Sequence, residues 1–379
     1  MPDRALEVAI IGAGMGGLAA AATLRRVGIT ARIYEQAGQF TRLGAGIQQS
    51  PNSIKVLRAL GLEPRLRALA FEPHSTRYRD AITGRLLWEK LQGPVFEDKF
   101  GAPHLLLHRA DLHSALASIV PPEVVHLGRR LVGFEQSSDS VTLRFADGST
   151  AEADAMIAAD GVHSLVREAL LGPEKPRWTG RVAFRTVFPA RLLGDLAIDD
   201  CAKWIGPDRH IVIYYTNPRR DEVYFVTSTP EPDFDIESWS SKGDMAELRA
   251  AYRDFHPDVR AVLDACPEAH KWALVERDPL PRWGTGRVFL LGDACHPMTP
   301  YMAQGAASAI EDAAVLARCL ERQPRDAAPH ALRVYEATRK PRTSHIQTIS
   351  ALNNIDRFKG EQENVYAYDV LSAPLIDPA

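Results

Sequence analysis

The N-terminal segment constrains the fold more than any other, because a short apolar strand leads directly into a glycine-rich turn. Glu7 to Ile11 reads EVAII, a β-branched run typical of a buried parallel strand. Residues 12–17 read GAGMGG, which matches the pattern G-x-G-x-x-G. The Ala-rich segment from Leu18 to Val27 then predicts a helix that ends before Gly28. This order of strand, turn and helix is typical of a dinucleotide-binding unit.

Each glycine of this turn has a separate physical task. Gly12 permits the tight turn, Gly14 lets the backbone approach a pyrophosphate, and Gly17 lets the helix pack on the strand. The free N–H groups and the dipole at the helix N-terminus favour phosphate. A second predicted strand, Thr30 to Tyr34, ends at Glu35, which can accept hydrogen bonds from an adenosine ribose. An acidic residue suits an unphosphorylated 2′-hydroxyl, so FAD or NAD is favoured over NADP.

Two later segments each predict a buried strand that ends in a polar turn and is followed by a helix. The expected elements are a strand at 155–159, the turn Asp160-Gly161, a helix at 164–170, a strand at 288–291, Gly292-Asp293, and a helix at 305–316. Asp293 follows the carboxyl end of its strand, which is where an open α/β sheet binds its ligand.

Residues 181–275 have a different character, since strand-like runs alternate with turns and predict an antiparallel meander. The expected strands are Val182–Phe188, Cys201–Ile205, Arg209–Thr216 and Glu222–Thr229. On the third strand, His210, Val212 and Tyr214 share one face because strand side chains alternate. A histidine and a phenol on one face can accept or relay a substrate proton. The same pattern also fits an ordinary hairpin with a half-buried histidine and a packed tyrosine, and periodicity leaves both interpretations open.

Composition excludes several other classes. The 45 basic and 48 acidic side chains give a formal charge of −3, so no basic excess is available for binding nucleic acid. The four cysteines are widely spaced and form no CxxC, which argues against a disulfide framework or a metal site and favours a cytoplasmic location. The uncharged run from Val8 to Leu24 is too short and too rich in glycine to span a membrane.

Taken together, the motifs resemble those of the single-component, FAD-dependent aromatic hydroxylases of the salicylate and para-hydroxybenzoate hydroxylase superfamily. Residues 12–17 with Glu35 match its dinucleotide fingerprint, Asp160-Gly161 with Ser164 and Arg167 match its DG motif, and residues 292–297 (GDACHP) match its GD motif. One small departure is Ala158, where the family usually has glycine. The order and spacing of the motifs across about 300 residues make the resemblance specific.

The resemblance implies an α/β fold (α+β overall), with a Rossmann-like FAD-binding domain and a mixed antiparallel β-sheet substrate domain. We expect the FAD-binding domain to comprise residues 1–75, 100–180 and 276–345, and the substrate domain residues 76–99 and 181–275. Residues 346–379 form a C-terminal segment, of which the polar stretch 353–379 is expected to cover either the substrate domain or a subunit interface.

The resemblance also implies non-covalently bound FAD, NADH or NADPH as a transient co-substrate, and O₂. Oxygen would pass from a flavin C4a-hydroperoxide to a small aromatic carboxylate. No nucleic acid, membrane or metal partner is expected, and the protein would be a monomer or a homodimer. Beyond the fingerprint, the implied cofactor-binding residues are Arg42, Gly46, Arg109, Asp160, Asp293, Gly305 and Ala306.

Within the superfamily, the chain is most similar to the 6-hydroxynicotinate monooxygenases, in which the positions of Cys201, His210 and Tyr214 line the substrate pocket. His210, alone or through Tyr214, is therefore the expected base or proton relay. Two expected substrate-binding positions depart from that group, since Gln48 and Tyr301 replace histidines and carry no cationic form.

These two departures leave the exact substrate open. A hydroxybenzoate or salicylate competes with a hydroxypyridine carboxylate, and decarboxylation on hydroxylation is undecided. The non-hydroxylase alternatives are a flavin-dependent dehydrogenase and a non-catalytic flavin-binding protein. A halogenase is disfavoured, because none of the six tryptophans lies in a WxWxIP segment.

Overall fold

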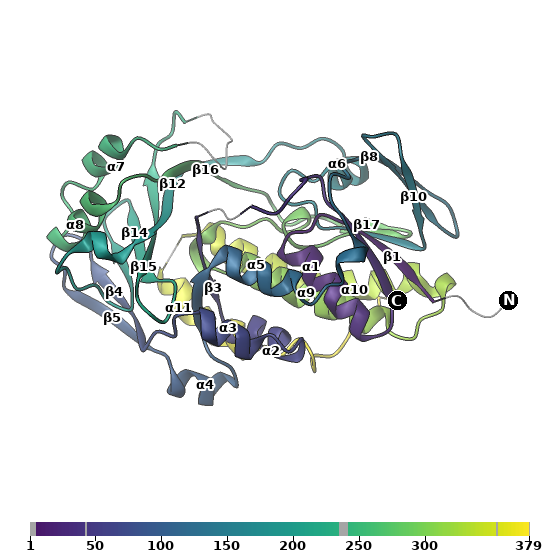
Figure 1. The fold of residues 1–379 in the computed structure, drawn as a ribbon, viewed down its shortest axis with the longest axis horizontal. Helices are drawn as coiled ribbons and strands as arrows, with labels where there is room; N and C mark the ends of the chain where they lie inside the picture. The colour runs from purple at the N-terminus through teal and green to yellow at the C-terminus, as the bar shows by residue number, and fades with distance from the viewer. Residues whose placement is uncertain (1–4, 42–43, 235–241, 354, 379) are drawn as a thin grey trace.

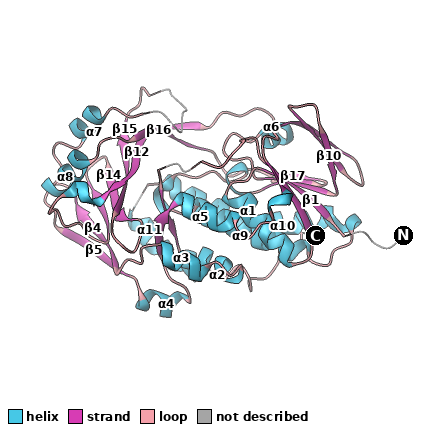
Figure 2. Cartoon of the chain, viewed as in Figure 1, coloured by secondary structure: helices cyan, strands magenta, loops and turns pink. Residues whose placement is uncertain are grey.

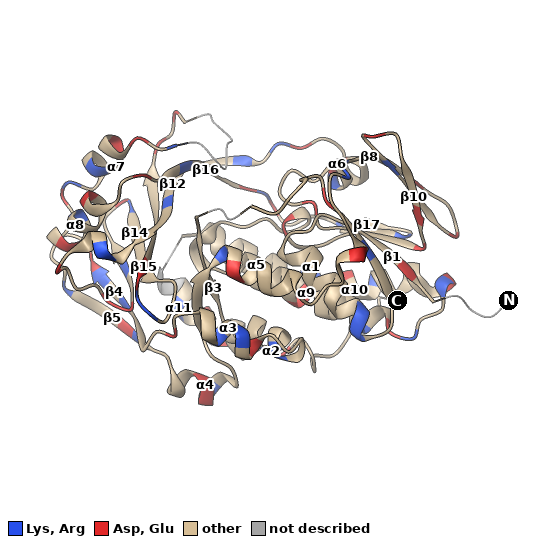
Figure 3. Ribbon diagram, in the orientation of Figure 1, with Lys and Arg blue, Asp and Glu red and all other residues tan. Residues whose placement is uncertain are grey.

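The computed structural model describes residues 5–41, 44–234, 242–353 and 355–378, which form two lobes joined through a layer of long helices (Figure 1). Strands gather at the two ends of the molecule and helices lie between them (Figure 2). Acidic and basic residues are interspersed over both lobes in this view (Figure 3), in keeping with the small net charge.

The first lobe is built on a six-stranded sheet with the order β17-β18-β11-β1-β2-β7. β1 pairs in parallel with both β11 and β2, which places the ends of the glycine turn and of the Asp160 turn side by side. The bounds are β1 Glu7–Ile11, β2 Thr30–Tyr34, β7 Val125–His126, β11 Ala155–Ala158, β17 Gly284–Thr285 and β18 Val288–Leu290. The strands expected at residues 7–11 and 30–34 are confirmed without a shift.

Helices cover this sheet, and two smaller sheets extend the lobe. The helices are α1 Met15–Arg26, α2 Pro51–Ala59, α3 Glu63–Leu69, α5 Arg109–Ala117, α6 Leu165–Leu171, α9 Gly305–Leu320 and α10 Ala328–Ala351. The smaller sheets pair β3 (Gly46–Gln49) with β6 (Leu105–His108), and β8 (Leu131–Gln136) with β9 (Val141–Phe145) and β10 (Thr150–Ala153). α1 begins three residues earlier than predicted, because the glycine turn already opens the helix at Met15.

The second lobe contains a seven-stranded sheet with the order β16-β12-β15-β14-β13-β4-β5. Its strands are β4 Ser75–Asp80, β5 Leu86–Leu91, β12 Arg177–Pro189, β13 Cys201–Ile205, β14 His210–Tyr215, β15 Glu222–Pro230 and β16 His270–Glu276. The predicted meander is correct for β13, β14 and β15. It is wrong for β12, which pairs with β15, because the long connection at residues 190–200 separates it from β13.

The two faces of this sheet have different neighbours. Ile211, Ile213 and Phe225 belong to a core with residues of α7 (Met245–Ala251) and α8 (Pro257–Ala265). The alternate residues Tyr214 and Tyr224 pack on the other side, toward the helical layer. The alternation expected for His210, Val212 and Tyr214 is thus confirmed.

The C-terminal segment lies against the second lobe. α11 (Ile355–Ala367) and α4 (Pro94–Phe100) share a small core in which Tyr366 contacts Phe96 and Phe100. Gln362 of α11 donates a hydrogen bond to the Tyr78 hydroxyl on β4 at 3.5 Å. α11 therefore contacts β4 and α4 of its own chain, and a role of this segment in a subunit interface stays untested.

Candidate active site

The glycine turn has the conformation and the space that a pyrophosphate requires. Gly12 has φ +98°, a value that favours glycine. A Cβ on Gly17 would collide with the carbonyl oxygen of Gly12, so the third glycine permits the close packing of helix and strand. A Cβ on Gly14 would meet no protein atom within 4 Å, and α1 has no side-chain cap. Open space beside uncapped N–H groups fits a phosphate-bearing ligand.

Glu35 follows β2, as predicted, and its carboxylate is bound to the neighbouring backbone. It accepts hydrogen bonds from the backbone N–H of Ala13 at 2.8 Å and of Ala37 at 2.9 Å. The carboxylate thereby fixes the glycine turn. A carboxylate has about four acceptor positions, so both oxygens keep capacity for ribose hydroxyls.

Arg109 and Asp293 are two opposite charges that each affect the pKa of the other. Both side chains are exposed, yet surrounding protein shifts their pKa values. Burial lowers the pKa of Arg109, although Asp293 opposes the shift. Burial raises the pKa of Asp293, although His296 and Arg109 oppose that shift. Two opposite charges that are exposed but poorly hydrated fit an interior channel for a charged cofactor such as FAD.

The DG and GD motifs are joined by one arginine. Arg167 donates hydrogen bonds to the carbonyl of Ala294 at 3.2 Å and to the carbonyl of Val162 at 2.7 Å. Beside it, Asp160 accepts from the backbone N–H of Val166 at 3.3 Å, while its other oxygen is buried without a partner among the described residues. Burial raises the pKa of Asp160. An unpartnered buried oxygen next to the glycine turn also fits a bound ligand.

A buried ionic network supports the GD motif, and no local sequence signal revealed it. Glu311 and Asp312 on α9 are fully buried, and Arg339 on α10 binds both, at 2.7 and 2.8 Å. Asp312 also pairs with His296 at 2.6 Å, and Glu311 accepts from Asn52 at 2.6 Å. The network fixes α9, whose N-terminus begins at Gly305, relative to α10 and α2.

The same region contains a group of possible metal ligands, Cys295, His296 and Asp312, whose ligand atoms lie within 4.8 Å of one another. Arg339 already neutralises Asp312, and the Cys295 thiol donates to the Gly292 carbonyl at 3.3 Å. Burial holds the pKa of Cys295 well above its usual range, so the thiolate that metals and nucleophilic chemistry need is disfavoured. The absence of a metal site stays a prediction.

Three of the predicted site residues, Cys201, His210 and Tyr214, lie on the inner face of the seven-stranded sheet. Register pairs Cys201 with Tyr214 and Tyr214 with Tyr224, and all three are buried. Val212 and Val226 also pair across the sheet, and both keep partial exposure. The two valines therefore form an apolar floor that a ring can reach.

His210 lies at one side of this floor. It is 8% exposed, and its ring has no hydrogen bond to any residue that the structure describes. The Tyr301 ring packs edge-on against it with centroids 5.4 Å apart, and the Tyr301 hydroxyl lies 2.9 Å from Ser228 Oγ. Burial, reinforced by Lys203 and Arg181, holds the pKa of His210 well below its usual range. The imidazole is therefore neutral, and its unprotonated nitrogen can accept a hydrogen bond from a substrate hydroxyl.

A direct relay from His210 to Tyr214 has no support in the structure. The two residues are four apart on β14, which separates them by about 13 Å along the strand, with Val212 between them. The neighbour of His210 is Tyr301. Burial raises the pKa of Tyr214 well above its usual range, so this phenol stays protonated.

Gln48 contacts an imidazole that the sequence interpretation missed. Its Oε1 lies 3.2 Å from Nε2 of His104, which is buried and whose pKa burial holds well below its usual range. A neutral histidine therefore lies next to Gln48. Arg42, also predicted to bind the cofactor, lies outside the described residues.

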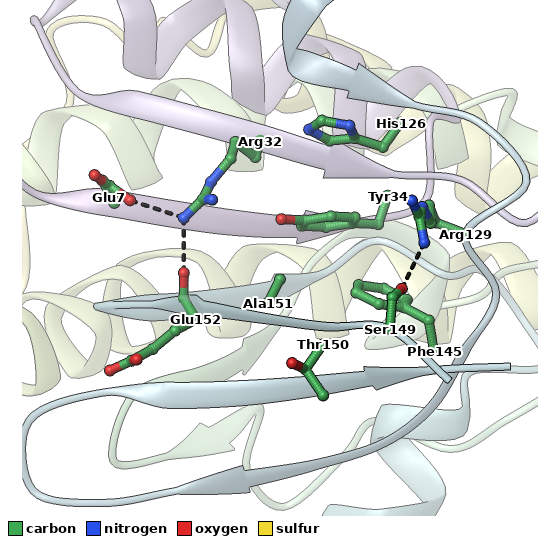
Figure 4. A pocket seen from close by; sticks show the side chains of 10 residues that line it. All are labelled: Glu7, Arg32, Tyr34, His126, Arg129, Phe145, Ser149, Thr150, Ala151 and Glu152. Atoms are coloured by element: carbon green, nitrogen blue, oxygen red, sulfur yellow. Dashed lines mark hydrogen bonds and ion pairs between the residues drawn. The ribbon is translucent and has the colours of Figure 1, made fainter. Parts of the chain in front are cut away.

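A separate hollow of about 670 Å³ lies between β2 and β10 (Figure 4). Tyr34, stacked on His126 at 5.1 Å, forms part of its wall, and Arg32 is bound to Glu7 at 2.7 Å. None of the predicted site residues lines this hollow, so it is distinct from the candidate active site.

The parallel sheet, the glycine turn and the interior charges of the first lobe define a dinucleotide-binding flavoprotein with a sheet-covered substrate side. The chain belongs to the FAD binding domain family, whose model matches residues 5–350. It is 45% identical to the 6-hydroxynicotinate 3-monooxygenase of Bordetella bronchiseptica, over 98% of this chain and 97% of that protein. The enzyme of the same name from Pseudomonas fluorescens is 43% identical over the same shares.

Among solved structures, Klebsiella pneumoniae HpxO complexed with FAD and uric acid matches with a TM-score of 0.82 and 27% identity. The match covers 96% of this chain and 92% of that one. FAD as the cofactor and the expected fold class are thereby confirmed. Within the described residues, no helix is both long and apolar enough to cross a membrane.

Proposed function

We propose that this FAD-dependent monooxygenase uses NADH or NADPH and O₂ to hydroxylate a hydroxylated pyridine or benzene carboxylate. The observation that carries the proposal is the place of His210, a neutral buried imidazole at the edge of the floor formed by Val212 and Val226. Similarity to two 6-hydroxynicotinate 3-monooxygenases supports a hydroxypyridine carboxylate as the first substrate to test.

In this proposal, His210 accepts the proton of the substrate's ring hydroxyl. Bound FAD supplies the redox chemistry, taking a hydride from the nicotinamide and activating O₂. A ring that carries an oxyanion is a much stronger nucleophile than the neutral phenol, so proton removal prepares the ring carbon for oxygen transfer. The Tyr301 ring packs against the imidazole, and its hydroxyl is hydrogen-bonded to Ser228. The Arg181 guanidinium in turn donates a hydrogen bond from Nε to Ser228 Oγ at 2.7 Å.

The surrounding residues position the ring and exclude water. Tyr214, Tyr224 and Cys201 close one side of the floor. The residues proposed to hold FAD are the glycine turn, Glu35, Arg109, Asp160 and Asp293. The N-terminus of α9 at Gly305 and Ala306 provides N–H groups that stabilise negative charge on the reduced cofactor.

The test is a substrate screen with the purified yellow protein. NADH consumption, product mass and peroxide are measured with 6-hydroxynicotinate, salicylate, 3-hydroxybenzoate and 4-hydroxybenzoate. We expect one acid to stimulate NADH consumption and to gain one oxygen, with or without loss of CO₂. His210→Gln should lower its turnover by roughly 10²–10⁴-fold, the usual contribution of a general base, at unchanged flavin content. Unchanged turnover across pH would contradict the role of His210.

A hydroxybenzoate is the second candidate substrate. Gln48 and Tyr301 carry no cationic form, whereas the resemblance places histidines at these two positions in the hydroxynicotinate enzymes. If these residues exclude 6-hydroxynicotinate, wild type should release more peroxide than product with it. The double variant Gln48→His/Tyr301→His should then raise the ratio of product to NADH consumed. Misplacement of a ring by about 1 Å can cost on the order of 10²-fold. Near-complete coupling in wild type would instead assign 6-hydroxynicotinate directly.

Three organisational features belong to the same proposal. The cofactor domain comprises residues 1–75, 100–180 and 276–345, and the substrate domain residues 76–99 and 181–275. The protein works in the cytoplasm, and it does so as a monomer or a homodimer, which sedimentation of the flavin-loaded protein can distinguish.

A further inference from the structure

Lys203 lies on the inner face of the seven-stranded sheet, beside the proposed substrate floor. It occupies the middle of β13, and its register partner on β14 is Val212. Residues opposite each other on antiparallel strands project to the same face. Lys203 therefore shares a face with Val212, Val226 and His210, and its position follows from the sheet register.

The ammonium group of Lys203 is buried and has no counter-ion among the residues that the structure describes. The residue is 9% exposed, and within the described part of the chain its Nζ makes no hydrogen bond and no ion pair. Its neighbour is the ring of Phe358 on α11, whose centroid lies 5.7 Å away. The other buried lysine of this sheet, Lys271, binds Glu231 and Glu247, each at 2.7 Å. The fold thus pairs one buried lysine with two carboxylates and leaves the other without one.

An unpaired buried cation costs free energy, so its presence calls for a compensating anion. Burial lowers the pKa of Lys203 to about 8, which still leaves the amine mostly protonated at neutral pH. The positive charge of Lys203 also affects His210, because it is one of the groups that lower the pKa of that imidazole. An anion that arrives with a ligand would satisfy the ammonium and would lie next to the proposed base.

The geometry of the two strands matches the two ends of one aromatic acid. His210 pairs with Ile205, and Lys203 is two residues from Ile205, so Lys203 and His210 are diagonal neighbours across the strand pair. Such neighbours lie about 7–8 Å apart at Cα. A six-membered ring resting on Val212 can therefore direct a hydroxyl toward one residue and a carboxylate toward the other.

We propose that Lys203 binds the carboxylate of the substrate and selects aromatic acids over their neutral analogues. The inference rests on the proposed function for the place of the ring, and it adds the group that recognises the acid. Lys203 is a substrate-positioning residue in this proposal, while His210 handles the proton. An ammonium–carboxylate contact also explains how the chain can bind an acid without the two histidines that Gln48 and Tyr301 replace.

A second lysine provides a matched control. Lys90 on β5 is half-buried, also makes no ion pair within the described residues, and lies over the rings of Phe96 at 5.8 Å and Tyr366 at 5.3 Å. It differs from Lys203 in facing the core shared by α4 and α11. Removing this charge should leave the selection of acids unchanged.

The experiment measures equilibrium binding to the oxidised, FAD-loaded protein by the change in flavin absorbance, without turnover. The ligands are 6-hydroxynicotinate and 4-hydroxybenzoate, each compared with its uncharged carboxamide. In wild type we expect the acids to bind more tightly than the amides. Lys203→Met should weaken binding of the acids by roughly 10–100-fold, the usual worth of a hydrogen bond between charged groups, and leave the amides unaffected. Lys203→Arg should keep the preference, as should Lys90→Met.

Melting temperature and flavin content confirm that each variant is folded. If Lys203→Met does not fold, Lys203→Gln serves as the second neutral variant. Three results would overturn the inference. Wild type would show no preference for the acids over the amides, the neutral variants of Lys203 would keep the preference, or the preference would be lost in Lys90→Met instead. A preference that depends on Lys203 in a protein that hydroxylates none of the acids would remove the proposed function and leave the carboxylate contact in place.

Discussion

A Cβ atom on Gly46 would lie 2.6 Å from the hydroxyl oxygen of Tyr214, so β3 approaches the substrate sheet more closely than any side chain allows. The same Cβ would lie 2.6 Å from the Tyr224 ring. The sequence interpretation assigned Gly46 to the flavin side. The structure adds that it is one point where the backbone of the first lobe closely approaches the second lobe.

Gly46→Ala should therefore destabilise the protein by about 1–3 kcal/mol, the usual cost of overpacking a close contact. Thermal unfolding of the FAD-loaded protein measures the change. Gly360→Ala is the control, because a Cβ there meets no atom within 4 Å and alanine favours the helix that carries it. The two variants should shift the melting temperature in opposite directions, and equal melting temperatures would show that β3 yields without cost.

Gly14→Val should give a colourless protein that still folds. A Cβ on Gly14 would meet no protein atom within 4 Å, so the side chain would enter the space that we propose for the pyrophosphate. The ratio of flavin to protein absorbance measures the cofactor, and circular dichroism of the flavin-free protein measures folding. Retention of a full complement of FAD would show that the pyrophosphate does not pass this glycine.

Stability should fall as the pH falls below about 6.5, because two buried histidines are neutral in the folded protein. The pKa values of His104 and His210 are both held well below the usual range by burial. The unfolded chain binds protons near pH 6.5 and the folded chain does not, so each histidine removes about 1.4 kcal/mol per pH unit below that value, until its folded pKa is reached. Urea unfolding at pH 7.5 and pH 5.5 measures the loss.

The double variant His104→Gln/His210→Gln should show a smaller loss of stability between the two pH values. An unchanged difference between pH 7.5 and pH 5.5 would mean that other groups control the acid sensitivity. His345, which is exposed, is the matched control, because replacing it by Gln removes a histidine without removing a buried one.

Arg339→Met should be among the most destabilising single substitutions, at about 3–5 kcal/mol, because it leaves Glu311 and Asp312 as buried charges with fewer partners. The triple variant that adds Glu311→Gln and Asp312→Asn should recover part of that loss. Chemical denaturation of the flavin-free proteins makes the comparison independent of cofactor binding. A triple variant less stable than Arg339→Met would contradict a purely electrostatic origin.

Local patterns in the sequence determined the elements that we propose to bind the cofactor. The strands at residues 7–11 and 30–34, the glycine turn and the side of β14 that His210 shares with Tyr214 were all predicted, because each depends on periodicity or backbone conformation within a few residues. The resemblance of the DG and GD motifs added the fold and FAD, both of which the structure and the family match confirm.

The tertiary structure alone decided which distant groups meet. Arg167 joins the two motifs across 127 residues of sequence. Arg339 on α10 pairs with the buried carboxylates of α9, and His104 contacts Gln48. Periodicity shows which face of an element is buried, but it carries no information about the element opposite. For that reason only the tertiary structure shows that Lys203 is buried beneath α11, a helix more than 150 residues later in the chain, with no counter-ion in the described part of the molecule.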